Sequence, residues 1–468
     1  MKQDIVTFAF ILGILGLFWL DRDRNSRTSK ALWIPVVWLS IAASRMVSQW
    51  LQMSLPIDPE MYLEGSPIDR LVLTGLLALG VIVLVRRGRK VGNLIGANVP
   101  TLLFFFYCAF SVLWSTYPDV AFKRWIKALG DLVMVMVVLT DSDPSAAVRR
   151  LLARSGFLLI PLSVLFIKYY PDIGRGYNRW TWTPYYCGVT TGKNLLGMTC
   201  VIMGLGFLWR FLIAYQNRDD PQRMRRLIAH GTLLGMVLWL FWIAQSVTSW
   251  SCFLLAGFLM AMMSISSVAN RPAVVHFLVG TILLVSFSAL FLNVGTGLLE
   301  TMGRDPTLTG RTEIWHEVIG MTGNPLIGTG FESFWLGDRL QQLWNRHWWH
   351  PNEAHNGYIE VFLNLGWVGV VLLVLLMVKG YRSVLSQLRR DPSAGKLGLA
   401  YFAVATTYSF TEAGFRMLNP VWIAFLLVTT VVPEVSGRAD PGIGTQAQRD
   451  EWEADLPTDT VAIYEEVL

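Results

Sequence analysis

The sequence predicts an all-α, polytopic integral membrane protein with about 12–13 transmembrane helices and one long loop on the outer side. Three observations lead to this prediction: 53% of the 468 residues are hydrophobic, only 15% are charged, and the apolar residues gather into long runs. Soluble proteins carry about 25% charged residues, so the composition excludes a soluble enzyme. An unpaired backbone group costs several kcal/mol in lipid, and each span is therefore expected to be helical.

Thirteen apolar runs reach, or nearly reach, the length of about 20 residues that a helix needs to cross the hydrocarbon. The first run is not expected to be a cleavable signal peptide, because DRDRNSRTSK follows it where small residues would stand. The sequence shows no internal repeat of the kind that marks many transporters. The runs are 5–20, 31–52, 71–85, 99–115, 127–140, 150–168, 195–215, 230–246, 249–267, 273–294, 357–378, 397–411 and 418–433.

Clusters of Lys and Arg orient these spans, because basic residues collect in cytoplasmic loops. The clusters lie in 21–30, 86–90, 149–154, 218–226 and 379–396. Alternation then places five connections on the outer side, namely 54–70, 116–126, 169–194, 295–356 and 412–417. With thirteen spans the N-terminus lies outside.

The predicted organisation has five parts. They are N-terminal transmembrane helices (1–98), a central transmembrane bundle (99–294), the outer loop (295–356), C-terminal transmembrane helices (357–433) and an acidic cytoplasmic tail (434–468) whose composition predicts disorder. The net charge of +6, from 39 basic and 33 acidic residues, points to lipid head groups rather than nucleic acid as the electrostatic partner. The four cysteines form no CxxC pair, so neither a disulfide framework nor a cysteine zinc site is expected.

The outer loop 295–356 is long enough to suggest a function of its own. Tryptophans crowd it, and they are interpreted either as an aromatic belt at the membrane interface or as platforms that stack on sugar rings. They are Trp315, Trp335, Trp344, Trp348 and Trp349.

Three histidines lie close together in this loop, at His347, His350 and His355. Pro351 interrupts HPNEAH, so the stretch lacks the helical spacing that places two imidazoles of a zinc motif on one face, and no metal is expected. His355 lies where the loop re-enters the membrane. A reference pKa of about 6.5 suits a general base there, and a purely structural histidine is the alternative.

Several basic residues lie in connections expected to be on the outer side, although Lys and Arg usually collect on the cytoplasmic side. Taken singly, each could reach toward lipid head groups. Taken together they suggest a cradle for a phosphorylated lipid, because Arg binds phosphate oxygens in a bidentate fork. They are Lys123, Arg124, Lys127, Arg175, Arg179, Lys193, Arg311 and Arg346.

An ordered set of short motifs resembles the O-antigen ligase and polysaccharide polymerase superfamily of bacterial inner-membrane proteins. The motifs are SVLWSTYPDVAFKRWIKALG (111–130), YYPDIGRGYN (169–178), GVTTGKNLLG (188–197), SVTSWS (246–251), GRTEIW (310–315), NPLIGTGFESF (324–334) and AHNGYIEVFLNLGWVG (354–369). They cover roughly residues 100–380. The order of the set is specific for the superfamily, and it does not separate its branches.

The resemblance implies a metal-independent, inverting glycosyltransferase without a cofactor. It uses an undecaprenyl-diphosphate-linked glycan as donor, a saccharide, lipid or protein as acceptor, and the periplasmic face of the inner membrane. Arg311 carries over as a ligand of the diphosphate and His355 as the base. Chain-length regulators and export proteins are the expected partners besides membrane lipids. The other expected substrate-binding residues are Lys193, Arg124, Arg179, Arg175, Asn356 and Tyr358.

Several alternatives stay open at this point. The enzyme is either a ligase or a polymerase, with GVTTGKNLLG and SVTSWS slightly favouring the polymerase branch. A transporter or flippase of lipid-linked sugars, or a non-catalytic assembly scaffold, are the competing classes. Glu412 near an outer span end either orients a base or is a satisfied polar residue of the bundle. The intramembrane charges Arg45 and Asp131 are expected to find partners inside the bundle.

Overall fold

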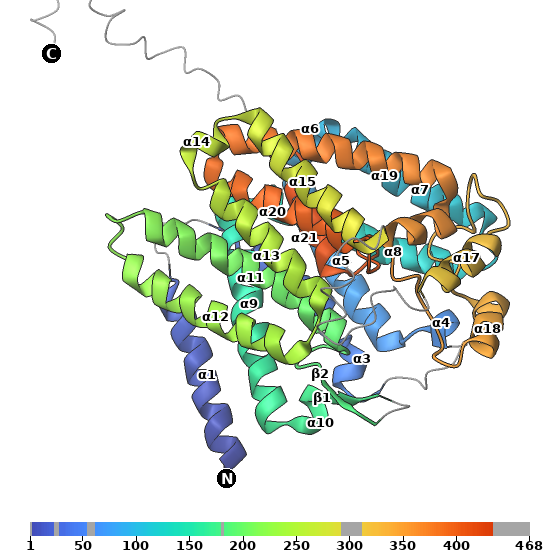
Figure 1. Cartoon of the computed structure of the whole chain (residues 1–468), viewed down its shortest axis with the longest axis horizontal. Coiled ribbons are helices and arrows are strands. Elements are labelled where there is room, and N and C mark those ends of the chain that lie inside the picture. The colour runs from blue at the N-terminus through green and yellow to red at the C-terminus, as the bar shows by residue number, and fades with distance from the viewer. Residues whose placement is uncertain (1, 23–27, 54–60, 179–181, 292–310, 434–468) are drawn as a thin grey trace, which may run out of the picture. The chain divides into compact units, whose positions relative to one another are not determined.

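The computed structural model describes residues 2–22, 28–53, 61–178, 182–291 and 311–433 (Figure 1), and every structural statement below refers to these residues. Arg179, the first part of the outer loop (295–310) and the expected tail (434–468) lie outside them. The description concerns the compact unit that ends at Val431.

The unit is helical, as expected, with one small antiparallel hairpin of β1 (Arg175–Tyr177) and β2 (Pro184–Tyr186). Its helices are α1 (Lys2–Leu20), α2 (Trp33–Ala42), α3 (Val47–Trp50), α4 (Met61–Glu64), α5 (Pro67–Arg86), α6 (Gly88–Ala97), α7 (Val99–Phe110), α8 (Pro118–Leu139), α9 (Pro144–Tyr169), α10 (Pro171–Gly174), α11 (Lys193–Gln216), α12 (Arg223–Ala244), α13 (Val247–Met262), α14 (Ser266–Ala269), α15 (Pro272–Phe291), α17 (Arg311–Gly320), α18 (Gly337–Arg346), α19 (Gly357–Arg390), α20 (Pro392–Tyr408) and α21 (Pro420–Thr429). Two 3₁₀ turns, η1 (Lys30–Leu32) and η2 (Ser111–Trp114), flank α2 and α7.

Each of the thirteen apolar runs coincides with a helix or a broken helix of the described chain. Six helices are long and apolar enough to cross a membrane: α1, α5, α9, α11, α12 and α19. A seventh span results if α6 and the α7–η2 helix, which meet at 88°, are counted as one. The remaining runs fall on helices whose apolar stretches are shorter, or on α8, whose N-terminal half carries charges. The protein is therefore a multi-pass membrane protein, and the count of 12–13 spans stays a prediction.

Polar contacts gather at two opposite sets of helix ends. At one set, Arg210 pairs with Asp21 at 2.8 Å and Arg87 pairs with Asp141 at 3.1 Å. Asp21 and Arg87 come from connections expected to be cytoplasmic, Asp141 directly follows the expected span 127–140, and Arg210 lies near the end of α11. At the other set, Gln3 in α1 donates to the carbonyl of Tyr169 at 2.9 Å. The first turn of α1 thus lies beside Tyr169, in a connection expected to be on the outer side.

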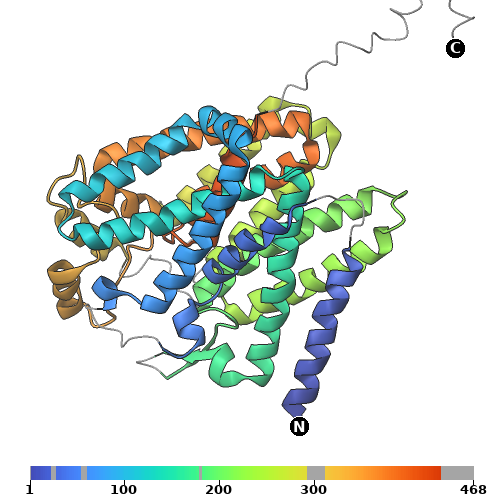
Figure 2. The same ribbon diagram turned by 180° about the vertical axis from the view of Figure 1, so that it is seen from behind.

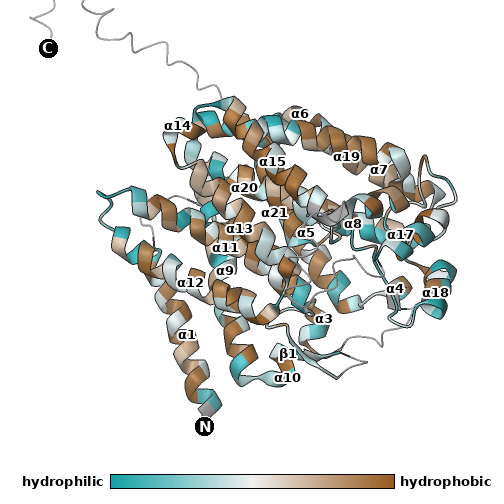
Figure 3. Cartoon of the chain, in the orientation of Figure 1, coloured by the Kyte–Doolittle hydropathy of each residue, from teal (hydrophilic) through white to brown (hydrophobic). Residues whose placement is uncertain are grey.

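The apolar faces of the helices form one continuous core, and the polar residues gather at helix ends and over α17 and α18 (Figure 3). Within the core, Asp131 accepts hydrogen bonds from the Trp38 indole at 2.7 Å and from the Leu418 backbone at 2.8 Å. Arg45 donates to the carbonyls of Thr190 and Ile173. Both intramembrane charges therefore have the partners expected of them.

The outer loop is locked onto α19 at a break inside that helix. Gly366 has φ 62° and ψ −165°, a conformation essentially restricted to glycine. The amides that follow it, from Trp367 and Val368, donate to the carbonyls of Pro325 and Leu326 instead of to their own helix. A Cβ at Gly366 would lie 2.3 Å from the carbonyl carbon of Leu326. From behind, α19 runs beside α7, with the loop at one end of the pair (Figure 2).

Replacing Gly366 by alanine is therefore expected to weaken the attachment of the loop. The forbidden conformation alone costs about 1–3 kcal/mol, and the backbone clash adds to it. We expect a lower melting temperature for detergent-solubilised Gly366→Ala protein and faster proteolysis of the loop. Gly235→Ala is the control, because this α12 glycine has nothing within 4 Å of its added Cβ. An unchanged melting temperature and digestion pattern for Gly366→Ala would contradict this account.

Candidate active site

The described part of the outer loop folds around a small hydrophobic core of its own. Trp315, Trp335 and Trp344 are buried in it, at 8%, 3% and 8% exposure. The Trp315 indole donates to the carbonyl of Ala354 at 2.7 Å, and the Trp344 indole to that of Pro351 at 2.8 Å. Because they are buried, these three tryptophans form neither an aromatic belt at the membrane interface nor a stacking platform for sugars. They hold the segment that precedes α19 in place. Trp348 remains exposed, at 63%.

The start of α19 is held by two polar side chains. The buried carboxylate of Glu360 accepts from the Trp335 indole at 3.0 Å and from the amide of Ala354 at 2.5 Å. The Asn356 side chain caps the helix by accepting from the amides of Tyr358 and Ile359. Between these anchors the backbone of His355 adopts φ 49°, which is uncommon for a residue other than glycine. The strained backbone fixes the direction of the His355 ring.

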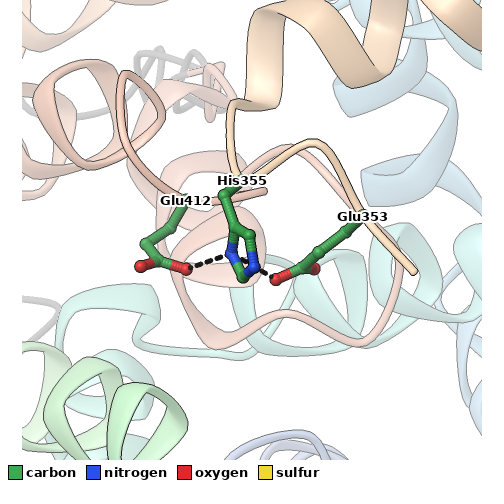
Figure 4. A group of neighbouring side chains, drawn as sticks. All are labelled: Glu353, His355 and Glu412. Carbon is green, nitrogen blue, oxygen red and sulfur yellow. Dashed lines mark hydrogen bonds and ion pairs between the residues drawn. The ribbon is translucent and has the colours of Figure 1, made fainter. Parts of the chain in front are cut away.

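The ring of His355 lies between two carboxylates (Figure 4). Its Nδ1 is 2.9 Å from Oε1 of Glu353, in the same loop, and 3.2 Å from Oε2 of Glu412, in the connection between α20 and α21. Only a quarter of the side chain is exposed. Nε2 has no hydrogen bond within the described residues, so it is the nitrogen available to a substrate.

On one side of this group stand the predicted residues Arg311 and Lys193. Arg311, the first residue of α17, donates to the carbonyl of Thr411 at 2.6 Å and approaches Oε1 of Glu412 at 3.4 Å. Asn194 donates to the same carboxylate oxygen at 3.1 Å, and its neighbour Lys193 begins α11 with an exposed side chain. Glu412 thus brings the two residues expected to be catalytic, Arg311 and His355, into one site.

On the other side, Arg416 continues the alternation of charges. It pairs with Oε2 of Glu353 at 3.1 Å and with Oε2 of Glu332 at 3.2 Å. Arg124 in α8 donates to the backbone carbonyl of Glu332 at 2.5 Å. The result is a row of alternating charges from Arg311 through the two carboxylates and His355 to Arg416.

These neighbours change the protonation of the site. Burial disfavours charge on the His355 ring, but the hydrogen bonds to Glu353 and Glu412 outweigh it and raise the pKa of His355 to about 10. Burial acts to raise the pKa of Glu353, but His355 and Arg416 lower it to about 2. The carboxylates likewise raise the pKa of Arg416 despite its burial. At neutral pH the ring is therefore mainly an imidazolium held by two carboxylates.

Glu353, His355 and Glu412 could geometrically share a metal ion, because their ligand atoms lie within 4.8 Å of one another. The chemistry of the group does not favour one. Arg311 and Arg416 already occupy the outer oxygens of the two carboxylates, so they supply the positive charge that a divalent ion would bring. His347 and His350 take no part in this group: His347 bonds Glu317 at 2.6 Å.

The remaining predicted residues have partners within the fold. Arg175 contacts the carbonyl of Ile167 and the ring of Tyr186 rather than the Glu412 group. Asn356 also donates to the carbonyl of Phe410, and the Tyr358 hydroxyl donates to that of Thr406. Both act here as positioning residues for α19, and their contact with substrate stays a prediction. Arg179 lies outside the described residues.

Sequence reasoning missed Glu332, Glu353, Arg416 and Asn194. For Arg416 a signal was present, because it is a basic residue in the outer connection 412–417 and belonged with the other outer cations. Asn194 directly follows Lys193 within GVTTGKNLLG, a motif that carries the resemblance. Glu353 stands two residues before His355 in HPNEAH, but nothing in the sequence shows that its carboxylate meets the ring, and only the fold brings Glu332 into this group.

Residues 195–374 match the family described as O-antigen ligase. The chain is 23% identical over 302 residues to the exopolysaccharide production protein ExoQ of Rhizobium meliloti (strain 1021), covering 62% of this chain and 67% of that protein. It is 21% identical over 356 residues to a Rickettsia felis protein named "Putative polysaccharide ligase", covering 71% of this chain and 80% of that protein.

The matched region contains Arg311, Glu353 and His355, and the fold adds Glu412 and Arg416 from beyond it. The motifs, the helical membrane fold and the matched domain agree with one another. The chain is therefore similar to the membrane polysaccharide ligases and polymerases of the O-antigen ligase-related superfamily.

Proposed function

We propose that this protein transfers a glycan from an undecaprenyl-diphosphate-linked donor to an acceptor hydroxyl at the periplasmic face of the bacterial inner membrane. One observation carries the proposal: Arg311 and His355 meet at Glu412, and the ring of His355 is oriented by carboxylates on Nδ1 so that Nε2 remains for a substrate. The relatives named for exopolysaccharide production and polysaccharide ligation support the same class of reaction.

In this reaction the acceptor oxygen forms a bond to the anomeric carbon while the bond from that carbon to the diphosphate oxygen breaks. The configuration at the carbon inverts, because the nucleophile arrives opposite to the leaving group. The hydroxyl proton passes to Nε2 of His355 when the ring is neutral. Glu353 and Glu412 hold the ring and stabilise the imidazolium that forms, as a carboxylate does in a Ser-His-Asp triad.

The leaving diphosphate gains negative charge as the bond breaks. Arg311 and Lys193 are the cations proposed to bind it, and fixed cations that interact most strongly with the transition state accelerate the reaction. The contact of Arg311 with Glu412 is long, at 3.4 Å, so a phosphate oxygen can compete for this guanidinium group.

Removing the ring or the guanidinium group is expected to abolish transfer. Because a general base contributes about 10²–10⁴-fold, His355→Ala should lower the rate at least about 100-fold, and Arg311→Ala should act similarly through the leaving group. The measurement is surface glycan on a gel from cells that lack the native gene, with membrane levels of each variant compared. Unattached full-length glycan identifies a ligase, and a single unextended repeat identifies a polymerase.

The matched controls are His316→Ala in the same loop and Arg382→Ala in the C-terminal half of α19. Both side chains are exposed and belong to neither the Glu412 group nor the predicted cradle, so both variants should make normal glycan. Normal glycan from both His355→Ala and Arg311→Ala would refute the proposed site and favour a transporter or scaffold.

The pH dependence of the purified enzyme tests the role of His355 as base. Below a pKa of about 10 the neutral fraction of the ring grows tenfold with each pH unit, so kcat should rise about tenfold per unit from about pH 6.5 to about 8.5. Glu353→Gln removes one carboxylate and lowers the pKa of His355, so its profile should level off at a lower pH. A flat profile would exclude the neutral ring as base and assign the imidazolium to binding the diphosphate.

Chelation is the corresponding test of metal independence. Since Arg311 and Arg416 occupy the carboxylates, EDTA should leave the activity of the purified enzyme unchanged, and added Mg²⁺ or Mn²⁺ should not increase it. Loss of activity in EDTA with recovery on adding one of these ions would assign Glu353, His355 and Glu412 to a metal.

A further inference from the structure

A second cationic region lies at the outer helix ends, apart from Arg311 and Lys193. It is a cavity of about 460 Å³ between the α3–α5 region and α8. Neither Arg311, Lys193 nor His355 lines it. Five basic side chains do: Arg70, Lys123, Arg124, Lys127 and Arg416.

The cations of this cavity exceed its anions. Of the two acidic residues in the lining, Asp69 is buried and already accepts from the amide and hydroxyl of Ser48, at 2.8 and 2.6 Å. Lys123 and Lys127, one helical turn apart on α8, have neither a hydrogen bond nor an ion pair with another described residue. Positive charge that no carboxylate contacts directly, at the end of a membrane helix, favours an anionic ligand.

Most of the remaining lining is apolar, beside the polar residues Ser48, Gln49, Ser66 and Thr74. Leu73 and Leu77 line the cavity along the middle of α5, and Ile126 lines it between the basic residues of α8. Just outside it, Leu71 on α5 is 76% exposed and Phe122 on α8 is 50% exposed, which are surfaces that lipid would cover. A ligand that fits both parts has an anionic head and a hydrocarbon tail.

The cavity touches the catalytic group at one point. Arg416 lines the cavity and also pairs with Glu353, which holds His355. Along this row of contacts the cavity stands at the end opposite to Arg311. The site of the proposed reaction therefore lies between two separate groups of cations.

We propose that this cavity binds the phosphate-bearing head of a second membrane lipid, which is the glycan acceptor, while the donor diphosphate binds at Arg311 and Lys193. The assignment of the two lipids as donor and acceptor rests on the proposed function. The binding of a phosphorylated lipid in this cavity does not depend on it. A polymerase would bring a second polyprenyl diphosphate to it, and a ligase a phosphorylated glycolipid; the shared chemistry is a phosphate on a lipid.

Binding is tested first, without catalysis. Full-length protein in detergent is titrated with dioleoyl phosphatidic acid, undecaprenyl phosphate or uncharged dioleoylglycerol, and bound lipid is counted by native mass spectrometry. Lys123→Gln/Lys127→Gln should lose about 10- to 30-fold in affinity for the phosphorylated lipids, since each lysine near an anionic lipid contributes about three- to fivefold. Arg382→Gln, outside the cavity, and His355→Ala should bind as the unchanged protein does.

The phosphate lipids also distinguish the two sources. Tighter binding of undecaprenyl phosphate than of phosphatidic acid identifies a polyprenyl-borne acceptor, and the reverse identifies a glycerolipid or glycolipid. Equal binding of dioleoylglycerol, or unchanged affinity in Lys123→Gln/Lys127→Gln, overturns the proposal. Because these measurements need no turnover, they can succeed even if the proposed reaction is wrong.

Kinetics then assign the bound lipid to its role. In the purified enzyme, Lys123→Gln/Lys127→Gln should raise KM for the acceptor about tenfold or more and leave KM for the donor and kcat nearly unchanged. An increase in donor KM instead would place the donor in this cavity and overturn the assignment. The pH profile should keep its shape, because neither lysine contacts His355.

Discussion

The bonds of His355 to two carboxylates are the interaction on which the site depends. Glu353 and Glu412 reach the ring from two segments that are distant in sequence, one before α19 and one after α20. The ring therefore joins the outer loop to the membrane bundle. Arg311, Asn194 and Arg416 are positioned through the same carboxylates, so the location of each depends on this junction.

Two carboxylates this close would repel each other without compensation, and burial would make both costly to ionise. The positive charges of the imidazolium between them and of an arginine on each outer side offset this repulsion.

The backbone around His355 is also held in place. Glu360 holds Ala354, Asn356 caps α19, and the buried indoles of the loop fix the segment that precedes His355. A ring placed this firmly retains its direction while substrates exchange.

Much of the fold could be predicted from hydropathy, because each apolar run coincides with a helix and the basic clusters gather at one set of ends. α6 was missed, since Gly88–Ala97 is amphipathic and begins within a basic cluster that resembles a loop. Arg311 and His355 could be predicted because both stand in short motifs. Their link through Glu412, and the pairing of Glu353 with Arg416, depend on contacts between distant segments. The burial of Trp315, Trp335 and Trp344 depends likewise on how the loop folds.

The contribution of Glu412 and Arg416 bears on how members of this superfamily can be recombined. Both lie outside residues 195–374, in a short connection between the last two helices. A chimera that receives only the matched domain of a relative would inherit a histidine whose two anchoring segments come from different parents. Exchange of residues 195–374 therefore preserves the site only when the α20–α21 connection is exchanged as well. The two segments are separate in sequence but form one unit in space.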